Sequence, residues 1–532
     1  MGSRTMAVFF TNNDLTKTVA NSPMHTLGNG DTLMIGPDAV LASLAAGSPI
    51  VSGGSNVTVQ VGGDLFTALE NAVVMGAGAD VTITADGSIT SAMDGVVMSG
   101  TNHDVVNAGS IMAERFAVDM GQGGTLSNSG QIVSGYGIRS NGWATILNTG
   151  EIEGYGNGYV NGSLSGSGSG SAINVLGGAE ITNSGSIAAG TGTAIAAGNG
   201  LSGGEVRLVN SGFIGGSPSQ GAVTTNAGAD QVINTGTISG RVFLYDGDDL
   251  YDGAQGVLIG RVVAGSGNDT VFGGAMGERI EADDGNDEVD GGGGRDVLFG
   301  LAGNDTLDGG DGDDVIEGGA GVDVMDGGAG TDMLSYMISS AGVEVNLTSG
   351  EASGGDAEGD VFANFEGVRG SAYADTLTGS KLADRLEGRG GDDLISSGAG
   401  NDRLFGQDGN DVLVGGAGMD VLCGGLGTDL FRYNSIAGST VATAGRDRIL
   451  DFNQAELDQI HLQTIDASTG LAGNQAFAFI GTAAFGKVAG ELRYDAGQQA
   501  TTIYGDTDGD GAADFAVQLA GKFTLTAADF ML

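Results

Sequence analysis

The chain has 532 residues, a formal net charge of −46, and 104 glycines against 4 prolines. This negative charge makes nucleic acid and anionic membrane surfaces poor partners and makes cations good ones. Because 40% of the residues are hydrophobic, the chain can build a core and need not be disordered. The glycines follow no Gly-X-Y triplet, which excludes collagen.

Three absences bear on where the chain folds. Cys423 is the only cysteine, so disulfides do not stabilise the chain, which fits either the cytosol or a secreted protein held together by metal. The apolar run at residues 6–10 is too short for the core of a signal peptide. No run of about 18 apolar residues predicts a transmembrane helix. If the protein is exported, we expect the export machinery to read another segment.

A first repeat, Asn-x-Gly-x-Ile, recurs between residues 80 and 240. Short alternating segments such as "VTIT" and "AEIT" accompany it and predict strands joined by tight turns. Repeats of about 20–50 residues indicate a solenoid, in which stacked coils would align the Ile side chains into a core and the Asn side chains into a ladder. The copies begin at Asn107, Asn128, Asn148, Asn183, Asn210 and Asn234.

We therefore predict a parallel β-helix over residues 25–260, preceded by an N-terminal cap at residues 1–24. The Gly/Ser-rich segment "GYGNGYVNGSLSGSGSGS" interrupts the repeat and is expected to be a loop between coils. The alternative left open by the pattern is a sandwich of similar short strands.

A second repeat has a period of nine residues, mostly Gly-Gly-x-Gly-x-Asp-x-Φ-x, where Φ is Leu, Val, Ile or Met. It forms a first array at residues 261–336, in which Glu278 takes one of the acidic positions, and a second at residues 371–434, separated by an insert at residues 337–370. The repeating aspartates are Asp269, Asp287, Asp296, Asp305, Asp314, Asp323, Asp332, Asp375, Asp384, Asp393, Asp402, Asp411, Asp420 and Asp429.

The two halves of the nonamer predict a calcium-binding β-roll. The glycine-rich half forms a turn whose carbonyl oxygens and Asp carboxylate face a shared position, and the Asp-x-Φ-x half forms a strand with one inward apolar side chain. Two nonamers close one flattened coil, so carboxylates of successive coils stack and repel each other unless a cation lies between them. Ca²⁺ accepts roughly 6–8 oxygen ligands, whereas Mg²⁺ demands a strict octahedron. We therefore expect the fourteen aspartates to bind several Ca²⁺ ions and this part to fold only with calcium. A disordered acidic spacer would show neither the spacing nor the apolar register.

The segment at residues 300–321 illustrates the assignment. Asp305 and Asp314 are its predicted metal ligands, and Leu307 and Ile316 its inward apolar residues. The remaining acids are expected to be solvated or to lie around the metal: Asp308, Asp311, Asp313 and Glu317.

The nonamers resemble those of the RTX, or haemolysin-type calcium-binding, family of secreted bacterial proteins. "GRDRILDFNQAELDQIHL", "GDTDGDGAADFAVQLAG" and the final "DFML" are similar to the C-terminal region of serralysin-type exoproteins. The resemblance implies that residues 435–532 form a β-rich region read by a type I secretion apparatus, with an acidic residue, Asp529, before the apolar Phe530, Met531 and Leu532. It also implies an extracellular or cell-surface location, with folding delayed until calcium is met outside the cell.

"DTDGDG", with Asp506, Asp508 and Asp510, opens like an EF-hand loop. The twelfth position is Val517 rather than Glu, which departs from that loop. A further calcium site and an acidic surface turn are both open.

The sequence shows no clear active site. Serralysins are zinc proteases, but the three histidines, His25, His103 and His461, do not form H-E-x-x-H, which excludes that chemistry. Some parallel β-helices are polysaccharide lyases, hydrolases or epimerases, whose sites need clustered acids and bases. The nearest candidates are two pairs, His103 with Asp104 and Glu151 with Glu153.

The sequence thus predicts an all-β chain: a parallel β-helix, then a calcium-binding parallel β-roll and a β-rich C-terminal secretion region. We expect a non-enzymatic protein that is structural, self-assembling or adhesive at the cell surface, with cell-surface glycan or copies of itself as partners. A polysaccharide-modifying enzyme is the alternative.

Overall fold

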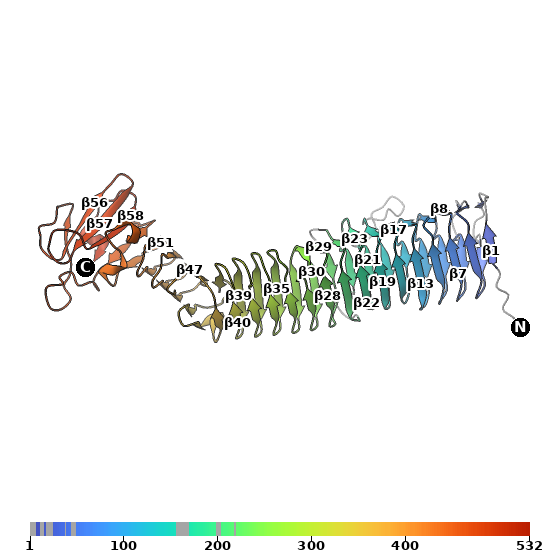
Figure 1. The fold of residues 1–532 in the computed structure, drawn as a ribbon, viewed down its shortest axis with the longest axis horizontal. Coiled ribbons are helices and arrows are strands. Elements are labelled where there is room, and N and C mark those ends of the chain that lie inside the picture. The colour runs from blue at the N-terminus through green and yellow to red at the C-terminus, as the bar shows by residue number, and fades with distance from the viewer. Residues whose placement is uncertain are drawn as a thin grey trace. The chain divides into compact units, whose positions relative to one another are not determined.

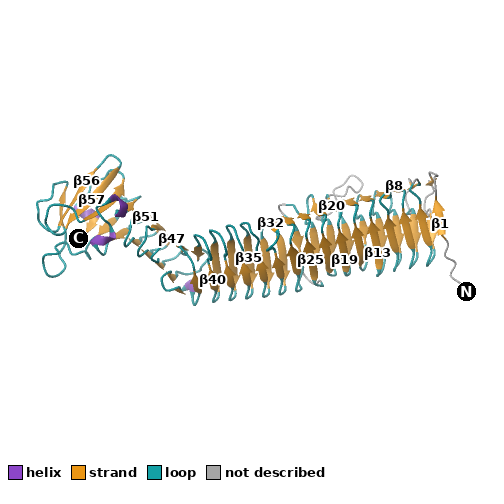
Figure 2. Cartoon of the chain, viewed as in Figure 1, coloured by secondary structure: helices purple, strands orange, loops and turns teal. Residues whose placement is uncertain are grey.

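The computed structural model describes residues 7–10, 15–17, 25–37, 39–43, 49–155, 170–197, 204–217 and 220–532. The chain divides into two compact units, Met1–Gly293 and Gly294–Leu532. Strands dominate both units (Figure 2), and the described residues hold only short 3-10 helices. These helices are η1 (Gly355–Ala357), η2 (Ile436–Gly438), η3 (Thr443–Gly445) and η4 (Ala527–Asp529). No helix among the described residues is long and apolar enough to cross a membrane.

The first unit is a stack of coils whose strands form three parallel sheets, each strand pairing with its counterpart one coil away (Figure 1). The first sheet contains β1 (Ala7–Phe10), β4 (Thr32–Ile35), β7 (Thr58–Val61), β10 (Asp80–Ile83), β13 (His103–Asn107), β16 (Gly124–Asn128), β19 (Ala144–Asn148), β22 (Ala179–Asn183), β25 (Val206–Asn210), β28 (Gln231–Asn234), β31 (Leu250–Asp252), β34 (Thr270–Phe272) and β36 (Glu288–Asp290). The second contains β2 (Leu15–Lys17), β5 (Val40–Ser43), β8 (Asp64–Thr67), β11 (Ser88–Ser91), β14 (Ser110–Ala113), β17 (Gln131–Ser134), β20 (Glu151–Gly154), β23 (Ser186–Ala189), β26 (Phe213–Gly215), β29 (Thr237–Ser239) and β32 (Val257–Ile259). The third contains β3 (His25–Leu27), β6 (Val51–Gly53), β9 (Val73–Met75), β12 (Val96–Met98), β15 (Val118–Asp119), β18 (Ile138–Ser140), β21 (Ile173–Val175), β24 (Ile195–Ala197), β27 (Val223–Thr224), β30 (Val242–Asp246), β33 (Val262–Ser266) and β35 (Arg279–Asp284).

The Asn-x-Gly-x-Ile repeat places one Asn and one Ile of each coil in the interior. The Asn side chains form the predicted ladder, in which each Nδ2 donates to the Oδ1 of the next Asn at 2.8 Å, from Asn107 through to Asn234. The Ile residues that follow, such as Ile132 and Ile187, are fully buried. Each Asn of the ladder makes at least one side-chain hydrogen bond, and within the ladder only Oδ1 of Asn107, at its start, has no partner, so the corner after the first sheet is satisfied in the coils that follow.

The coil changes at the end of the Asn-x-Gly-x-Ile repeat. β32 is the last strand of the second sheet, and beyond Ile259 each coil of the first unit contributes strands to the first and third sheets alone, within the described residues. A three-strand coil therefore becomes a shorter two-strand coil at the point where the period of nine begins.

The second unit continues this two-strand pattern by itself. One row of strands comprises β38 (Thr306–Asp308), β40 (Val324–Asp326), β44 (Val361–Ala363), β43 (Glu351–Ser353), β42 (Glu344–Asn346), β46 (Thr376–Thr378), β48 (Leu394–Ser396), β50 (Val412–Val414), β52 (Leu430–Arg432), β54 (Gln459–His461) and β59 (Phe530–Met531). The other comprises β37 (Val297–Ala302), β39 (Val315–Ala320), β41 (Met333–Ser335), β45 (Gly367–Arg369), β47 (Arg385–Gly390), β49 (Arg403–Asp408), β51 (Val421–Leu426), β53 (Arg448–Ile449), β58 (Phe515–Ala520), β57 (Ala500–Asp506), β56 (Glu491–Ala496) and β55 (Ala478–Gly481).

The strands of the insert at residues 337–370 remain part of the stack of coils. β44 pairs in parallel with β40, β43 runs antiparallel beside β44 and β42, and β42 pairs in parallel with β46. A single reversed strand thus links the two arrays, and β45 fills the corresponding place in the other row. The C-terminal part adds an antiparallel meander, β56–β57–β58, which joins the other row through β53.

The expected fold class, an all-β chain built on a parallel β-solenoid, is confirmed, and the parallel pairing excludes the sandwich. The domain boundaries at 24, 260, 336, 370 and 434 stay predictions. Most of the predicted cap, and residues 156–169 of the predicted Gly/Ser-rich loop, lie outside the described residues.

Candidate metal centre

The fourteen predicted metal aspartates are all buried. Each stands immediately before a strand, and the Φ residue two positions later points into the core, as Leu307 and Ile316 do after Asp305 and Asp314. An aspartate so deeply buried needs partners for its carboxylate oxygens. The question is which atoms supply them.

One carboxylate oxygen is satisfied by the backbone of the neighbouring coil. The N–H of Asp393 donates to Oδ1 of Asp411 at 2.9 Å, and the N–H of Asp411 donates to Oδ1 of Asp429 at 3.0 Å. The same contact recurs in both arrays between aspartates 18 residues apart, for example from Asp314 to Asp332. The offset of 18 residues confirms that two nonamers make one coil, and it aligns the carboxylates in two rows.

The other oxygen, Oδ2, has no donor in most of these carboxylates. This holds among the described residues for Asp269, Asp314, Asp323, Asp332, Asp393, Asp402, Asp411, Asp420 and Asp429. Burial, with the charges of neighbouring acids, raises the pKa of Asp393 to about 8 and that of Asp429 to about 7. Rows of buried, half-satisfied carboxylates fit a hard cation that takes oxygen ligands.

The first glycine of the nonamer makes room for this oxygen. A Cβ on Gly318 would lie 2.2 Å from Oδ2 of Asp323, and one on Gly424 would lie 2.1 Å from Oδ2 of Asp429. The glycine is thus required by the close approach of the carboxylate to the turn, not only by the backbone conformation of the turn.

The first two aspartates of the second array differ from the others. The backbone N–H and hydroxyl of Ser371 both donate to Asp375, and those of Ser380 both donate to Asp384. Their carboxylates therefore have protein donors on both oxygens, so these two positions depend least on a cation.

Both arrays end with the same pattern, Gly-Thr-Asp-x-apolar-x-Tyr, in which the apolar residue is Leu334 or Phe431. The Tyr replaces the first glycine of the next nonamer and is buried at Tyr336 and at Tyr433. The hydroxyl of Tyr336 donates to Oδ2 of Asp360 at 3.0 Å. The hydroxyl of Tyr433 lies near Asp447, whose pKa burial raises to about 8, but Oδ2 of Asp447 keeps no hydrogen-bond partner among the described residues. At the end of the first array, a hydroxyl thus takes the place left open beside the Oδ2 atoms within the arrays.

Several acids outside the nonamers also belong to the rows, and sequence analysis missed them. Backbone N–H groups donate to their carboxylates in the same way, at Asp230, Asp249, Asp360, Glu366, Asp447 and Asp458. Three of the six keep Asp-x-Φ, as in "ADQV" and "RDRI", and Asp249 and Asp360 have an aromatic residue, Tyr251 or Phe362, at the Φ position. That shorter signal, widened to aromatic residues and followed without the glycines, would have found those five.

Glu317 differs from the three other acids that were expected to be solvated or to lie around the metal. Asp308, Asp311 and Asp313 are exposed as predicted, but Glu317 is buried and accepts hydrogen bonds from the Ser335 hydroxyl and the Ile338 N–H. Glu317 lies on a face of β39 that residues after β41 cover. The nonamer pattern alone does not predict this cover.

The EF-hand-like segment gathers a different triad from the one expected. Carboxylate oxygens of Asp506, Asp508 and Asp514 lie within 4.8 Å of one another, whereas Asp510 is exposed and accepts from the Ala512 N–H. Asp506 already accepts two backbone N–H groups, from Gly509 and Gly511. The third acid, Asp514, lies eight residues after Asp506 and outside the segment "DTDGDG" that suggested the site.

The two candidate pairs of the β-helix differ in geometry. His103 points into the core and Asp104 outward from the same strand, β13, so the two face opposite sides. Burial lowers the pKa of His103. Glu151 and Glu153 share the outward face of β20, and Glu151 accepts from Gln131.

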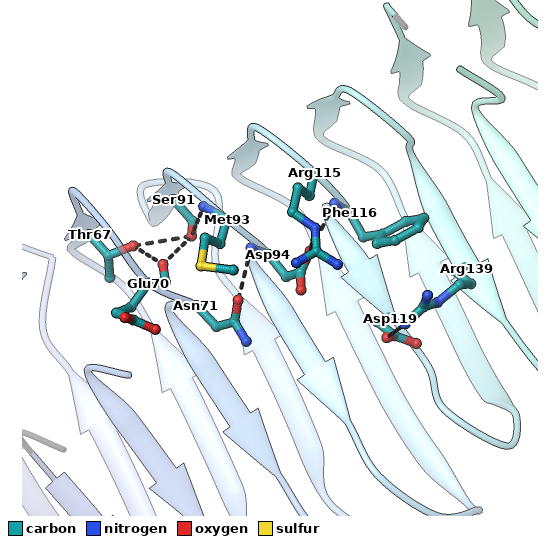
Figure 3. Close-up of polar contacts among 10 residues, drawn as sticks. All are labelled: Thr67, Glu70, Asn71, Ser91, Met93, Asp94, Arg115, Phe116, Asp119 and Arg139. Carbon is teal, nitrogen blue, oxygen red and sulfur yellow. Dashed lines mark hydrogen bonds and ion pairs between the residues drawn. The ribbon is translucent and has the colours of Figure 1, made fainter. Parts of the chain in front are cut away.

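A mixed charge cluster lies instead on three successive coils of the β-helix (Figure 3). Asp94 pairs with Arg115 at 3.6 Å, and Asp119 pairs with Arg139. The Arg139 guanidinium lies 4.3 Å over the Phe116 ring. Both carboxylates are largely buried, and burial raises the pKa of Asp94.

Polar contacts continue the cluster over the preceding coils in Figure 3. Asn71 accepts from the Asp94 N–H, and the hydroxyls of Thr67 and Ser91 both donate to the Glu70 carbonyl. A buried carboxyl beside two guanidinium groups is the kind of group that can take part in proton transfer.

The family of the chain follows from comparison with known proteins. Residues 251–532 match the family model of the peptidase M10 serralysin C-terminal region, which is more than half of the chain. The chain belongs to this family. Residues 251–532 are thus a serralysin-type C-terminal region, which extends well beyond the residues 435–532 where that resemblance was expected, and residues 1–250 lie outside the match.

Solved structures similar to parts of the chain come from two bacteria. The AlgE6R2 and AlgE6R3 subunits of the Azotobacter vinelandii mannuronan C5-epimerase are 30% and 28% identical, cover 30% of this chain each and 92% and 78% of their own, with TM-scores of 0.23 and 0.19. The extracellular lipase LipA from Serratia marcescens is 17% identical over 48% of this chain and 40% of its own, with a TM-score of 0.12. No curated protein sequence matches the chain.

Proposed function

We propose that the chain is a secreted calcium-binding protein whose nonamer coils fold when calcium binds outside the cell. One observation carries this proposal: rows of buried aspartates keep one carboxylate oxygen without a donor while the other accepts a backbone N–H. A cation bound by these oxygens gives each unpaired oxygen a partner and removes the repulsion between carboxylates along the row.

All fourteen nonamer aspartates are proposed ligands, in two arrays at residues 261–336 and 371–434. Asp375 and Asp384, which have serine donors, contribute the least. The C-terminal residues 435–532 are proposed to be read by a type I secretion apparatus. Because β59 is packed against β54 in the folded chain, that recognition requires the unfolded state, which low cytosolic calcium maintains.

For the β-helix we propose a structural, self-assembling or adhesive role at the cell surface, with cell-surface glycan or other copies as partners. Its stacked parallel sheets present continuous outward faces with many hydroxyl and acidic side chains, such as Thr125, Thr145 and Glu180 of the first sheet.

The experiment is a calcium titration of the full-length protein, followed by circular dichroism and light scattering. We expect strand content to rise between EDTA and ~5 mM calcium, within reach of extracellular sites of roughly 10⁻⁴–10⁻³ M. The variant Asp402→Asn should shift the midpoint to higher calcium, whereas Asp408→Asn, an exposed acid of the same array, should not. Unchanged strand content across the titration contradicts the proposal. Growth of scattering with calcium supports assembly, and a monomer that binds glycan supports adhesion.

The charge cluster of Figure 3 favours a second candidate, a polysaccharide-modifying enzyme. Its test is turnover by the wild type on a panel of uronate-containing polysaccharides. If the candidate is right, Asp94→Asn should lower turnover about 100-fold or more, as loss of a proton-transferring group does, while Asp86→Asn, an exposed acid on a nearby turn, keeps it. The absence of turnover on the whole panel would count against the enzyme.

A further inference from the structure

Residues 244–252 form a turn and a strand that carry no complete nonamer but repeat its structure. They lie at the end of the Asn-x-Gly-x-Ile repeat, and most of them precede residue 251, where the serralysin-type region begins. The segment "LYDGDDLYD" has Leu, Tyr and Asp at the first three nonamer positions, but keeps Gly247, Asp249 and an inward apolar ring, Tyr251.

The backbone of this turn matches that of the nonamers. Tyr245 has φ 74 and Gly247 has φ 140; the equivalent Leu301 and Gly303 have φ 79 and 140. A positive φ costs energy for any residue with a Cβ, so tyrosine holds this conformation against its own preference. We infer that the carbonyl groups of the turn have the orientation that they have in the nonamers.

Two rows of side-chain contacts run through this segment into the first array. Oδ1 of Asp248 accepts from the Asn268 N–H at 2.8 Å, as Oδ1 of Asn268 accepts from the Asn286 N–H at 3.0 Å. The Asp249 N–H donates to Oδ1 of Asp269 at 2.8 Å. The segment is therefore in register with the nonamers at both the variable and the metal-binding position.

Asp249 is the member of this segment whose second oxygen is unsatisfied. Its Oδ1 accepts the Asp230 N–H at 2.6 Å, its side chain is 3% exposed, and its Oδ2 has no hydrogen-bond partner. Asp230, one coil earlier, is the useful contrast, because the N–H groups of Val206 and Asn226 satisfy its two oxygens.

We propose that Asp249 binds one calcium ion, with carbonyl oxygens of the 244–248 turn as further ligands, so that the metal row begins inside the β-helix. This inference rests on the proposed function, since it takes the nonamer coils to bind calcium. It has a structural consequence: the last three-strand coils order fully only when calcium binds. The competing explanation is a proton, because burial raises the pKa of Asp249 to about 8.

The test compares two variants of the full-length protein, Asp249→Asn and Asp230→Asn. Both keep the size of the side chain. The calcium bound per chain after equilibrium dialysis should fall by one ion in Asp249→Asn and should be unchanged in Asp230→Asn. An equal calcium content in Asp249→Asn and the wild type means that Asp249 holds a proton and overturns the proposal.

Hydrogen exchange of the wild type gives a second measurement that does not depend on the folding of a variant. Amides of residues 244–252 should be protected in calcium and should lose that protection in EDTA at pH 7. If the nonamers at 296–332 respond to calcium and residues 244–252 do not, this inference is wrong and the proposed function stands. If neither segment responds, the proposed function itself is wrong.

Discussion

At the scale of single residues, the nonamer glycines and aspartates act as pairs. The first glycine has a negative or extended φ at Gly318, so backbone strain does not explain it. Instead its missing Cβ leaves space for the carboxylate of Asp323. The sequence pattern alone does not distinguish a glycine required by backbone strain from one required by a close contact, because both appear as glycine at the same position.

Gly318→Ala tests this pairing. The added Cβ would meet Oδ2 of Asp323 at 2.2 Å and its Cγ at 2.8 Å, so the carboxylate must move from its row. We expect a loss of about 1–3 kcal/mol in the calcium-saturated free energy of unfolding, as overpacking usually costs. Gly470→Ala, with no atom within 4 Å of the new Cβ, should change it little. Calcium-dependent chemical denaturation measures both, and equal values for the two variants would refute the steric explanation.

The Asn ladder is the calcium-independent counterpart of the aspartate rows. Nδ2 of Asn148 donates to Oδ1 of Asn183 and to the Ser186 carbonyl, while its own Oδ1 accepts from Asn128. Asn148→Ala should destabilise the β-helix by about 1–3 kcal/mol for each buried group left unpaired, equally with calcium and with EDTA. Leu147→Ala, an outward neighbour, is the control. A loss of stability that appears only with calcium would contradict the independence of the Asn ladder from the aspartate rows.

At the scale of elements, the array ends are defined by Tyr336 and Tyr433 rather than by the loss of aspartates. Acids continue in the rows beyond both tyrosines, at Asp360 and Asp447. At the end of the first array the donor changes, because the Tyr336 hydroxyl donates to the second oxygen of Asp360. A hydroxyl is a fixed, metal-independent partner, so the first array stops at a coil whose carboxylate does not need a cation.

Tyr336→Phe should therefore weaken the second unit even at saturating calcium. The substitution leaves Oδ2 of Asp360, now bonded at 3.0 Å, buried without a donor, which costs about 1–3 kcal/mol. Tyr373→Phe, an exposed tyrosine of the same unit, should have no such effect. Thermal unfolding in excess calcium measures the difference. A Tyr336→Phe variant as stable as the control would show that the hydroxyl does not close the row.

The solenoid could be predicted from the sequence because its repeats are short and strict. Asn-x-Gly-x-Ile predicted the Asn ladder, and the period of nine predicted the buried aspartates and the 18-residue coil. The reversed strand β43, the cover over Glu317 and the contribution of Asp514 could not be predicted. Each depends on a contact between segments that share no repeated pattern, which leaves no periodic signal.

At the scale of the whole molecule, charge and folding are coupled through the aspartate rows. With 66 acidic and 20 basic residues, the chain has few cations of its own to place beside buried carboxylates. Under the proposed function, calcium concentration alone separates export from folding, and no other partner has to be invoked for the chain to stay unfolded before export and to fold after it.

This coupling predicts that protons can partly replace calcium. Burial raises the folded-state pKa to about 6 for Asp411 and Asp420 and to about 8 for Asp393, above the unfolded value of roughly 3.9. The stability gained by protonation is therefore fully present below about pH 4 and is lost as the pH rises through the folded pKa values, between about 6 and about 8.

We expect the protein in EDTA to gain strand content when the pH falls from 8 to 5, and the protein in saturating calcium to show little change over the same range. Circular dichroism at several pH values, with and without EDTA, measures both. The sign separates this mechanism from ordinary acid denaturation, in which salt-bridged carboxylates lose stability as the pH falls. A loss of strand content on acidification in EDTA would mean that repulsion along the rows does not oppose folding, and repulsion could then not be the cause of the calcium requirement.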